Sequence, residues 1–153
     1  MKLFATLLSV VLIAFAALFT LALSPSDAEA DRAEIQSVVE QSYLNGAFNR
    51  LDTEAMEKGF HPVFKIHGVQ EGSLSQYPIA DWITSIEKRK AAPDFDPKDQ
   101  TWEYKFAMID VTGVAGMAKI ELFRKGEHVY TDYLSLLKLS DGWKITDKVY
   151  HRH

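Results

Sequence analysis

The spacing of apolar positions changes along the chain, from a helical repeat in the first half to strict alternation in the second. Between residues 31 and 50, "DRAEIQSVVEQSYLNGAFNR", one stripe recurs at helical spacing and the charges lie opposite it. This stripe predicts an amphipathic helix that packs through one face, and its members are Ile35, Val38, Val39, Ser42, Tyr43 and Ala47.

Two shorter helices are expected after this one. Asp52 is a suitable N-cap for a helix that runs through Lys58, and Gly59 is expected to end it in a left-handed conformation. Pro78 suits the first position of a third helix, in which apolar residues again recur at i, i+3, i+4 and i+7.

The remaining segments have the pattern of strands. A first strand is expected at residues 63–69, and after the third helix a meander follows, broken at Thr112-Gly113, Lys125-Gly126 and Asp141-Gly142. In "TWEYKFAMI" the large residues of one face are Trp102, Tyr104, Phe106 and Met108. The order predicts an α+β fold, with N-terminal helices packed on a curved antiparallel sheet in the shape of a cone.

The first thirty residues are interpreted as an export segment. Residues 3–23 carry no charge, Lys2 precedes them, and three acidic residues follow by Asp31. Cleavage after Ala30 leaves a periplasmic or secreted domain at 31–153, whereas an uncleaved segment anchors the domain to a membrane, facing away from the cytoplasm. Both alternatives stay open.

The amino-acid composition excludes several kinds of site and partner. The chain has no cysteine, which removes thiolate catalysis and cysteine-ligated zinc, and its net charge of −4 without a basic block argues against nucleic acid as a partner. The five histidines show no metal-ligand spacing, and no phosphate or dinucleotide fingerprint suggests a cofactor. We therefore expect neither a metal nor a cofactor.

Asp132 is the most informative polar residue because it lies inside an apolar strand. If Asp141-Gly142 forms a two-residue turn, Ser140 pairs with Trp143 and Asp132 lies opposite His151, on the more apolar face of the hairpin. Asp132 is then expected to point inward, although a slip of one residue would reverse its direction. Such a carboxylate is either a polar anchor for a ligand, one member of an inert buried pair with His151, or a solvated group at the sheet edge.

The residues "VVEQSYLNGAFNRLDTEAMEKGFHPVFKIHG", "YPIADWITSIEKR" and "YTDYLSLLKLSDGWKITDKVYH" resemble the nuclear transport factor 2-like superfamily, in its SnoaL-like and lumazine-binding branch. In ketosteroid isomerase-like members, a Tyr on the first helix and an Asp on the penultimate strand bind a substrate oxyanion, and Tyr43 and Asp132 match those positions. The position of their proton-shuttling base is Gly68 here. The resemblance therefore implies binding rather than proton transfer.

The leading hypothesis is an exported domain that holds a small, partly apolar ligand, for which the family implies a lumazine- or pterin-like heterocycle. One alternative is a small isomerase or dehydratase that uses Asp132 and His151 as an acid/base pair. Another is a homodimerisation module whose pocket is filled by side chains. The expected ligand-binding residues are Tyr43, Phe64, Ile66, Trp82, Tyr130, Asp132 and His151.

Overall fold

The computed structural model describes residues 27–153. The predicted export segment at residues 3–23 lies outside the described residues. Within residues 27–153, every helix is too short or too polar to cross a membrane.

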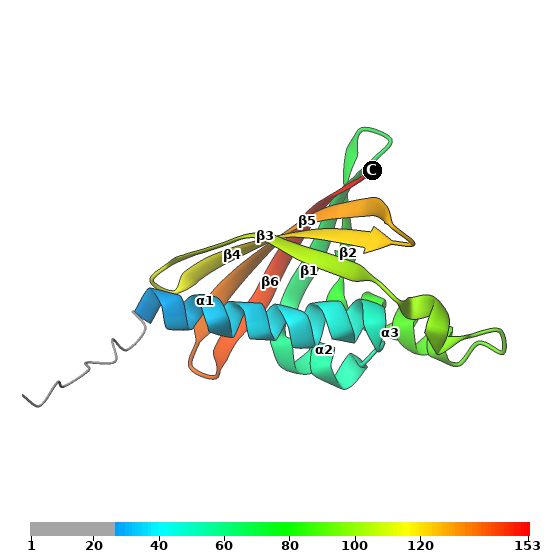
Figure 1. Cartoon of the computed structure of the whole chain (residues 1–153), viewed down its shortest axis with the longest axis horizontal. Helices are drawn as coiled ribbons and strands as arrows, with labels where there is room; N and C mark the ends of the chain where they lie inside the picture. Colours follow the sequence, from blue (N-terminus) through cyan, green and yellow to red (C-terminus); the bar gives the residue numbers. More distant parts are fainter. Residues whose placement is uncertain (1–26) are drawn as a thin grey trace, which may run out of the picture.

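Within the described residues, five helical segments form the helical layer, and the first two of them join end to end (Figure 1). The first helix and the segment after it make one continuous rod across the sheet, and the next two helices lie beside the C-terminal half of that rod. The bounds are α1 Asp27–Val38, η1 Val39–Asn49, α2 Thr53–Gly59, α3 Ile79–Lys90 and the 3₁₀ turn η2 Pro97–Gln100.

The rod widens from an α-helix to a π-helix at η1, and this changes which residues it buries. Arg50 N donates to Asn45 O at 2.8 Å, a bond that spans five residues rather than four. Leu44 is buried and the ring of Phe48 meets that of Tyr43 edge-on at 5.1 Å. A stripe drawn at 3.6 residues per turn omits both Leu44 and Phe48, so the predicted face was too narrow.

The short helix α2 begins as predicted and ends for a different reason. Asp52 Oδ1 accepts a hydrogen bond from Ala55 N at 3.0 Å, which confirms the N-cap. Gly59 is not among the glycines with positive φ, so the predicted left-handed ending is wrong. A Cβ at Gly59 would lie 2.0 Å from Ser42 Oγ, and this position therefore needs glycine because α2 packs closely on η1.

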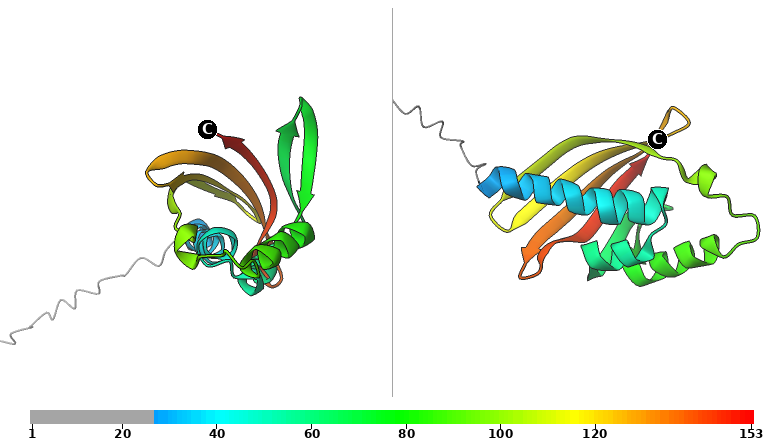
Figure 2. Two further views of the ribbon diagram at one scale, coloured as in Figure 1. Left: turned by 90° about the vertical axis from the view of Figure 1, so that its right-hand side faces the viewer. Right: turned by 60° about the horizontal axis from the view of Figure 1, so that its bottom comes forward.

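Six strands form one sheet in the order β2-β1-β6-β5-β4-β3. Their bounds are β1 Phe60–Gln70, β2 Ser73–Pro78, β3 Glu103–Thr112, β4 Ala115–Arg124, β5 Glu127–Leu139 and β6 Gly142–Arg152. The sheet curves over the helices, which confirms the predicted α+β architecture (Figure 2). It is not antiparallel throughout, because β1 and β6 run parallel. The edge strand β2 was not predicted, since its mostly exposed sequence "SLSQYP" has no alternating apolar pattern.

The register of the β5–β6 hairpin differs from the predicted one in two ways. Leu139 pairs with Gly142, so the loop consists of Ser140 and Asp141, and this two-residue change of register leaves every side chain on its predicted face. Thr146 is then an extra residue between Ile145 and Asp147, a β-bulge that reverses the faces of β6 beyond it.

A second bulge has the same effect on β3. Phe106 pairs with Ile120 and Met108 with Lys119, so Ala107 is the extra residue. Met108 is 42% exposed, and Ile109 packs on the core in its place. The prediction that Met108 shares the face of Phe106 is therefore wrong.

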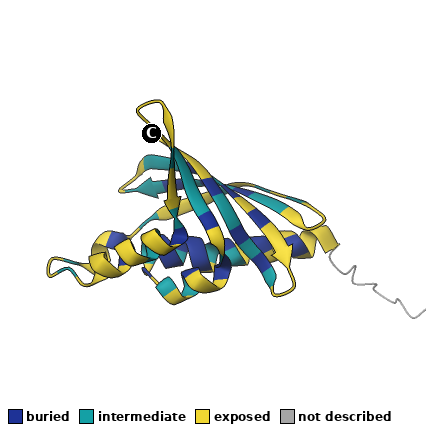
Figure 3. Ribbon diagram, turned by 180° about the vertical axis from the view of Figure 1, so that it is seen from behind, coloured by how far each residue is buried: buried dark blue, intermediate teal, exposed yellow. Residues whose placement is uncertain are grey.

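The core lies between the concave face of the sheet and the helical rod (Figure 3). Buried residues gather where these layers meet, whereas the hairpin tips are exposed. Its largest fully buried side chains include Tyr43, Phe64, Ile35, Leu44, Leu51 and Met56.

Candidate ligand site

Three polar side chains meet inside the cone, and we call Tyr43, Asp132 and Lys148 the inner cluster. Asp132 is 0% exposed, so its predicted inward direction is confirmed. The Tyr43 hydroxyl donates a short hydrogen bond to Asp132 Oδ2, and Lys148 Nζ donates to the Tyr43 hydroxyl at 2.7 Å. These side chains come from η1, β5 and β6, so the cluster joins the rod to the centre of the sheet.

Lys148 also forms an ion pair with Asp132. Its Nζ lies 3.2 Å from Asp132 Oδ1, but at an angle that makes no hydrogen bond, and this oxygen has no hydrogen-bond partner among the described residues. The side chain of Lys148 is 6% exposed and that of Asp132 is 0% exposed. An ion pair this deeply buried is costly to desolvate, so it does not by itself explain stability.

Aromatic rings surround the ammonium group of Lys148. Its Nζ lies between 5.0 and 5.8 Å from the centroids of four rings. The faces of such rings attract cations. The four rings belong to Tyr43, Phe48, Trp82 and Tyr150.

Burial dominates the proton affinities of the inner cluster. It raises the pKa of Tyr43 well above the usual 10.0, and the charge of Asp132 adds to this shift. Burial also lowers the pKa of Lys148 below the usual 10.5, although the attraction of Asp132 opposes this shift. The cluster therefore holds Tyr43 in its neutral form and weakens the hold of Lys148 on its proton.

His151 does not belong to this cluster, and the predicted Asp132–His151 pair is wrong. Tyr150 is the residue opposite Asp132, and His151 pairs with Thr131 and is exposed. The bulge at Thr146 is the physical reason, because it moves His151 to the outer face and brings Lys148 inward.

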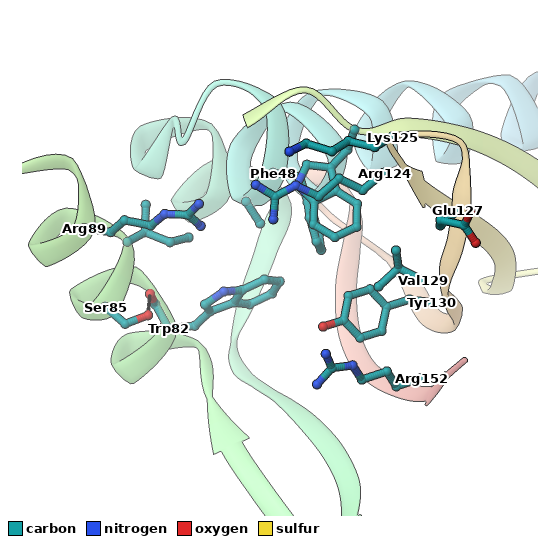
Figure 4. A pocket seen from close by; sticks show the side chains of 13 residues that line it. Phe48, Trp82, Ser85, Arg89, Arg124, Lys125, Glu127, Val129, Tyr130 and Arg152 are labelled. Carbon is teal, nitrogen blue, oxygen red and sulfur yellow. Dashed lines mark hydrogen bonds between the residues drawn. The ribbon is translucent and has the colours of Figure 1, made fainter. Parts of the chain in front are cut away.

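Two adjoining cavities open beside the inner cluster. The larger has a volume of about 760 Å³ and the smaller about 360 Å³, and they share Phe48, Trp82 and Tyr130 as walls. Figure 4 shows these three rings in the larger cavity, with charged side chains around it. Lys148 lines the smaller cavity, together with Phe48, Ile66, Gly68, Ser75, Tyr77, Trp82, Tyr130 and Tyr150.

Four basic side chains line the larger cavity, and we call Arg89, Arg124, Lys125 and Arg152 the basic rim (Figure 4). Within residues 27–153, none of the four makes an ion pair, and Glu127 is the only carboxylate among the lining residues. Unneutralised cations around an aromatic cavity attract anionic ligands.

Arg124 is held in the basic rim by two contacts. Its Nη2 donates to the carbonyl of Asp99 at 2.9 Å, and its guanidinium lies over the ring of Trp102 at 5.4 Å. Trp102 in turn stacks on Tyr130 at 5.9 Å. One continuous aromatic wall therefore connects the rim with the rings shared by the two cavities.

Comparison with known proteins shows the family to which this chain belongs. Residues 30–151 match the family described as "Putative lumazine-binding". The chain belongs to this family. Two crystal structures are similar, an NTF-2 like protein of unknown function from Silicibacter pomeroyi DSS-3 and an NTF2-like protein of unknown function from Shewanella baltica OS155. Both have a TM-score of 0.62 and cover 79% of this chain and 94% of their own, with 25% and 27% identity respectively.

These likenesses confirm the predicted membership of the nuclear transport factor 2-like superfamily. A curated relative, the aldolase FrzH from Cladobotryum sp, is 22% identical over 123 residues, which cover 79% of this chain and 93% of the relative.

Only some of the residues predicted to bind a ligand line the two cavities. Ile66, Trp82 and Tyr130 line the cavities, whereas Phe64 is fully buried in the core and stacks on Trp82 at 6.2 Å. Neither Tyr43 nor Asp132 lines the two cavities, because Lys148 lies between them and the smaller one. Their predicted contact with a ligand stays a prediction.

Gly68, which the resemblance placed at the position of the isomerase base, has no side chain, and little room remains for one. Gly68 lines the smaller cavity, where an added Cβ would lie 3.1 Å from Ser75 Oγ. His67 points to the opposite face, and its Nε2 lies 3.0 Å from Asp147 Oδ2. In the described part of the chain, no three His, Cys, Asp or Glu residues are grouped so that they could hold a metal ion.

The sequence did not reveal several residues of the site, among them Lys148, Phe48 and Arg152. Lys148 was missed because the bulge at Thr146, which turns it inward, has no sequence signal. Phe48 was missed because η1 widens, and Arg152 because it lies beyond the same bulge. Alternation in β6 would predict that Lys148 and Arg152 face the cone only if the bulge were already known.

Proposed function

We propose that this domain binds a small, planar, partly apolar ligand that carries an anionic group. The supporting observation is the larger cavity, in which aromatic walls adjoin the four cations of the basic rim. Its volume of about 760 Å³ is in the range of small-molecule sites. The rings of Phe48, Trp82, Trp102 and Tyr130 suit the faces of a flat molecule.

A lumazine- or pterin-like heterocycle fits this description. Such a molecule has flat apolar faces and an edge rich in hydrogen-bond acceptors, which the guanidinium groups of the rim can bind. The family description supports the same class of ligand. The two cavities count against a cone filled by side chains, and a homodimer through the outer face of the sheet stays a prediction.

Calorimetric titration of residues 31–153 with lumazine and with pterin-6-carboxylate tests the proposal. We expect both to bind, and the carboxylate to bind more tightly because it adds a charge for the rim. Arg152→Gln should weaken binding of the carboxylate about tenfold, the typical effect of one lost charge-assisted hydrogen bond.

The matched control is Arg32→Gln, since Arg32 is an exposed arginine on α1 that lines neither cavity. It should leave both affinities unchanged. Failure of the folded protein to bind either compound would reject this ligand class, and equal losses in both variants would show that the rim acts only through net charge.

A second candidate function is catalysis on a carbonyl compound. The buried amine of Lys148 favours it, because lysines with weakened proton affinity are suited to attack carbonyl groups. The likeness to the relative named as an aldolase supports the same class of chemistry. The isomerase or dehydratase alternative with Asp132 and His151 as its acid/base pair has no support, since His151 lies on the outer face.

We also propose, from the sequence, that the domain works outside the cytoplasm. Residues 1–30 fused to alkaline phosphatase without its own signal should produce active enzyme in bacterial cells, because this enzyme matures only where disulfides form. Replacing Leu12 and Ala16 by Lys should abolish that activity. Activity that survives these charges would argue against export by this segment.

A further inference from the structure

Lys148 is the one member of the inner cluster that lines a cavity. It lies in the wall of the smaller cavity, while Tyr43 and Asp132 are behind it in the core. A ligand that enters this cavity would therefore reach the amine of Lys148 before either of its partners.

A purely structural role explains this arrangement poorly. Buried ion pairs are often no more stable than apolar residues of similar size, so stability alone gives little reason to bury Lys148. The pair is also incomplete, because Asp132 Oδ1 has no hydrogen-bond partner in residues 27–153. A buried polar atom without a partner calls for an explanation, and a role in the chemistry of the adjoining cavity is one such explanation.

The surroundings of Lys148 provide what an amine nucleophile needs. Burial lowers its pKa, which increases the share of neutral amine at neutral pH. A carboxylate oxygen that can take the proton lies 3.2 Å from Nζ, and the Tyr43 hydroxyl holds Nζ in place at 2.7 Å. The surrounding rings act in the other direction, since they stabilise the ammonium form.

We infer that Lys148 forms an imine with the carbonyl group of a ligand held in the smaller cavity. This inference rests on the proposed function, because it requires that the adjoining cavities bind a small molecule.

The chemistry balances without any further reactant. Asp132 takes the ammonium proton, the neutral amine adds to the carbonyl carbon to form a C–N bond, and one of the two amine hydrogens moves to the carbonyl oxygen as the C=O π bond breaks. Loss of that oxygen as water, with the second amine hydrogen, gives the imine. When protonated, the imine withdraws electrons from the neighbouring carbon, so that a carbon–carbon bond one atom further away can form or break.

The cavities also limit the ligand. The smaller one joins the larger at Phe48, Trp82 and Tyr130, so a ligand whose carbonyl reaches Lys148 extends between these rings toward the basic rim. The geometry thus favours an aromatic aldehyde or ketone with an anionic group at the far end.

Reductive trapping with 4-carboxybenzaldehyde tests the inference. The full-length protein is incubated with this probe and cyanoborohydride, which reduces an imine to a stable amine, and modified lysines are located by peptide mass spectrometry. Lys148 should be modified about tenfold faster than Lys144, which is on the same strand and lines neither cavity, because only a neutral amine attacks. Lys148→Arg should remove this rapid modification, whereas Lys144→Arg should leave it unchanged.

A probe without a carbonyl separates binding from reaction. 4-(Hydroxymethyl)benzoate has the same ring and carboxylate, and it should bind by calorimetry and slow the modification of Lys148 in the unaltered protein. This protection experiment needs no variant, so it decides the question even if Lys148→Arg does not fold.

Three outcomes are informative. Rapid modification of Lys148 that the alcohol slows supports the inference. Binding of the alcohol with Lys148 modified no faster than Lys144 overturns the imine and leaves the proposed binding function intact. Absence of binding together with absence of selective modification overturns both.

Discussion

Two clusters in this molecule contain the same parts in different surroundings. The inner cluster combines Asp132 with a lysine and a tyrosine. Near the turn between β5 and β6, Asp31 Oδ1 accepts from Lys138 Nζ at 2.5 Å and from Trp143 Nε1 at 3.1 Å, and we call Asp31, Lys138 and Trp143 the outer cluster. Each cluster therefore consists of one carboxylate, one lysine and one aromatic hydrogen-bond donor.

The two lysines respond in opposite directions. The hydrogen bond to Asp31 raises the pKa of Lys138, whose side chain is 40% exposed. Burial lowers the pKa of Lys148, whose side chain is 6% exposed, despite an equivalent partner. Lys138 therefore holds its proton firmly near the surface, whereas Lys148 holds its proton weakly in the core. The reason is that the cost of desolvating the lysine outweighs the attraction of the carboxylate only where water is excluded.

The largest expected effect is the loss of one partner from the inner cluster. Asp132→Asn should reduce the free energy of unfolding by about 3–5 kcal/mol, because it leaves the charge of Lys148 buried without its counter-ion. Asp31→Asn should cost clearly less, since water can solvate Lys138. Urea denaturation of the two variants measures both losses, and equal losses would show that burial does not distinguish the clusters.

Replacing both charges of the inner cluster should recover most of that loss. Asp132→Leu combined with Lys148→Met removes the cost of desolvating both groups, so the double variant should be within about 2 kcal/mol of the original protein. The matched double variant is Asp31→Leu with Lys138→Met, for which we expect little recovery. A double-mutant cycle on each pair gives the coupling energy. If the losses in unfolding free energy caused by the Asp132 and Lys148 substitutions are nearly additive, the proposed difference between the inner and outer clusters is contradicted.

Acid should affect the outer cluster through Asp31. The hydrogen bonds from Lys138 and Trp143 lower the pKa of Asp31 below its usual 3.8, so this residue contributes its full stability above pH 3.8. That contribution is lost as the pH falls from 3.8 through the pKa of the folded state. Asp31→Asn should therefore narrow the difference in unfolding midpoint between pH 6 and pH 3. An unchanged difference would show that other carboxyl groups control acid unfolding.

Salt should produce the smallest difference. Raising the ionic strength from 0.1 to 1 M shortens the screening length from about 10 to about 3 Å. The loss of stability caused by Lys138→Met should shrink over this range, whereas the loss caused by Lys148→Met should not, because ions do not enter the core. Urea midpoints at the two salt concentrations test this, and parallel changes in both variants would contradict it.

Much of the architecture could be predicted from local patterns. The N-cap at Asp52, the three helical segments and the strand meander after the third helix depend on residues close in sequence, and all are present in the structure. The edge strand β2 and the parallel pairing of β1 with β6 depend on partners far away in sequence, and both were missed.

The candidate site shows the same contrast between features that depend on local sequence and features that depend on distant partners. The inward direction of Asp132 was predicted because alternation in β5 is unbroken between Tyr130 and Leu136. Its partner was predicted wrongly because β6 contains one extra residue at Thr146, and a single extra residue exchanges the two faces of a strand. The sequence could show that a carboxylate enters the core, but not which cation meets it there.

By itself, the sequence determined the main helices, the long strands, the family and the presence of a buried acid, because these follow from the residue pattern. Only the tertiary structure decided that Lys148 rather than His151 meets that acid, that Phe48 enters the cavity wall, and that scattered basic residues form one rim. The physical reason is that bulges, helix widening and the convergence of distant strands arise from packing between elements, and none of these has a local signal in the chain.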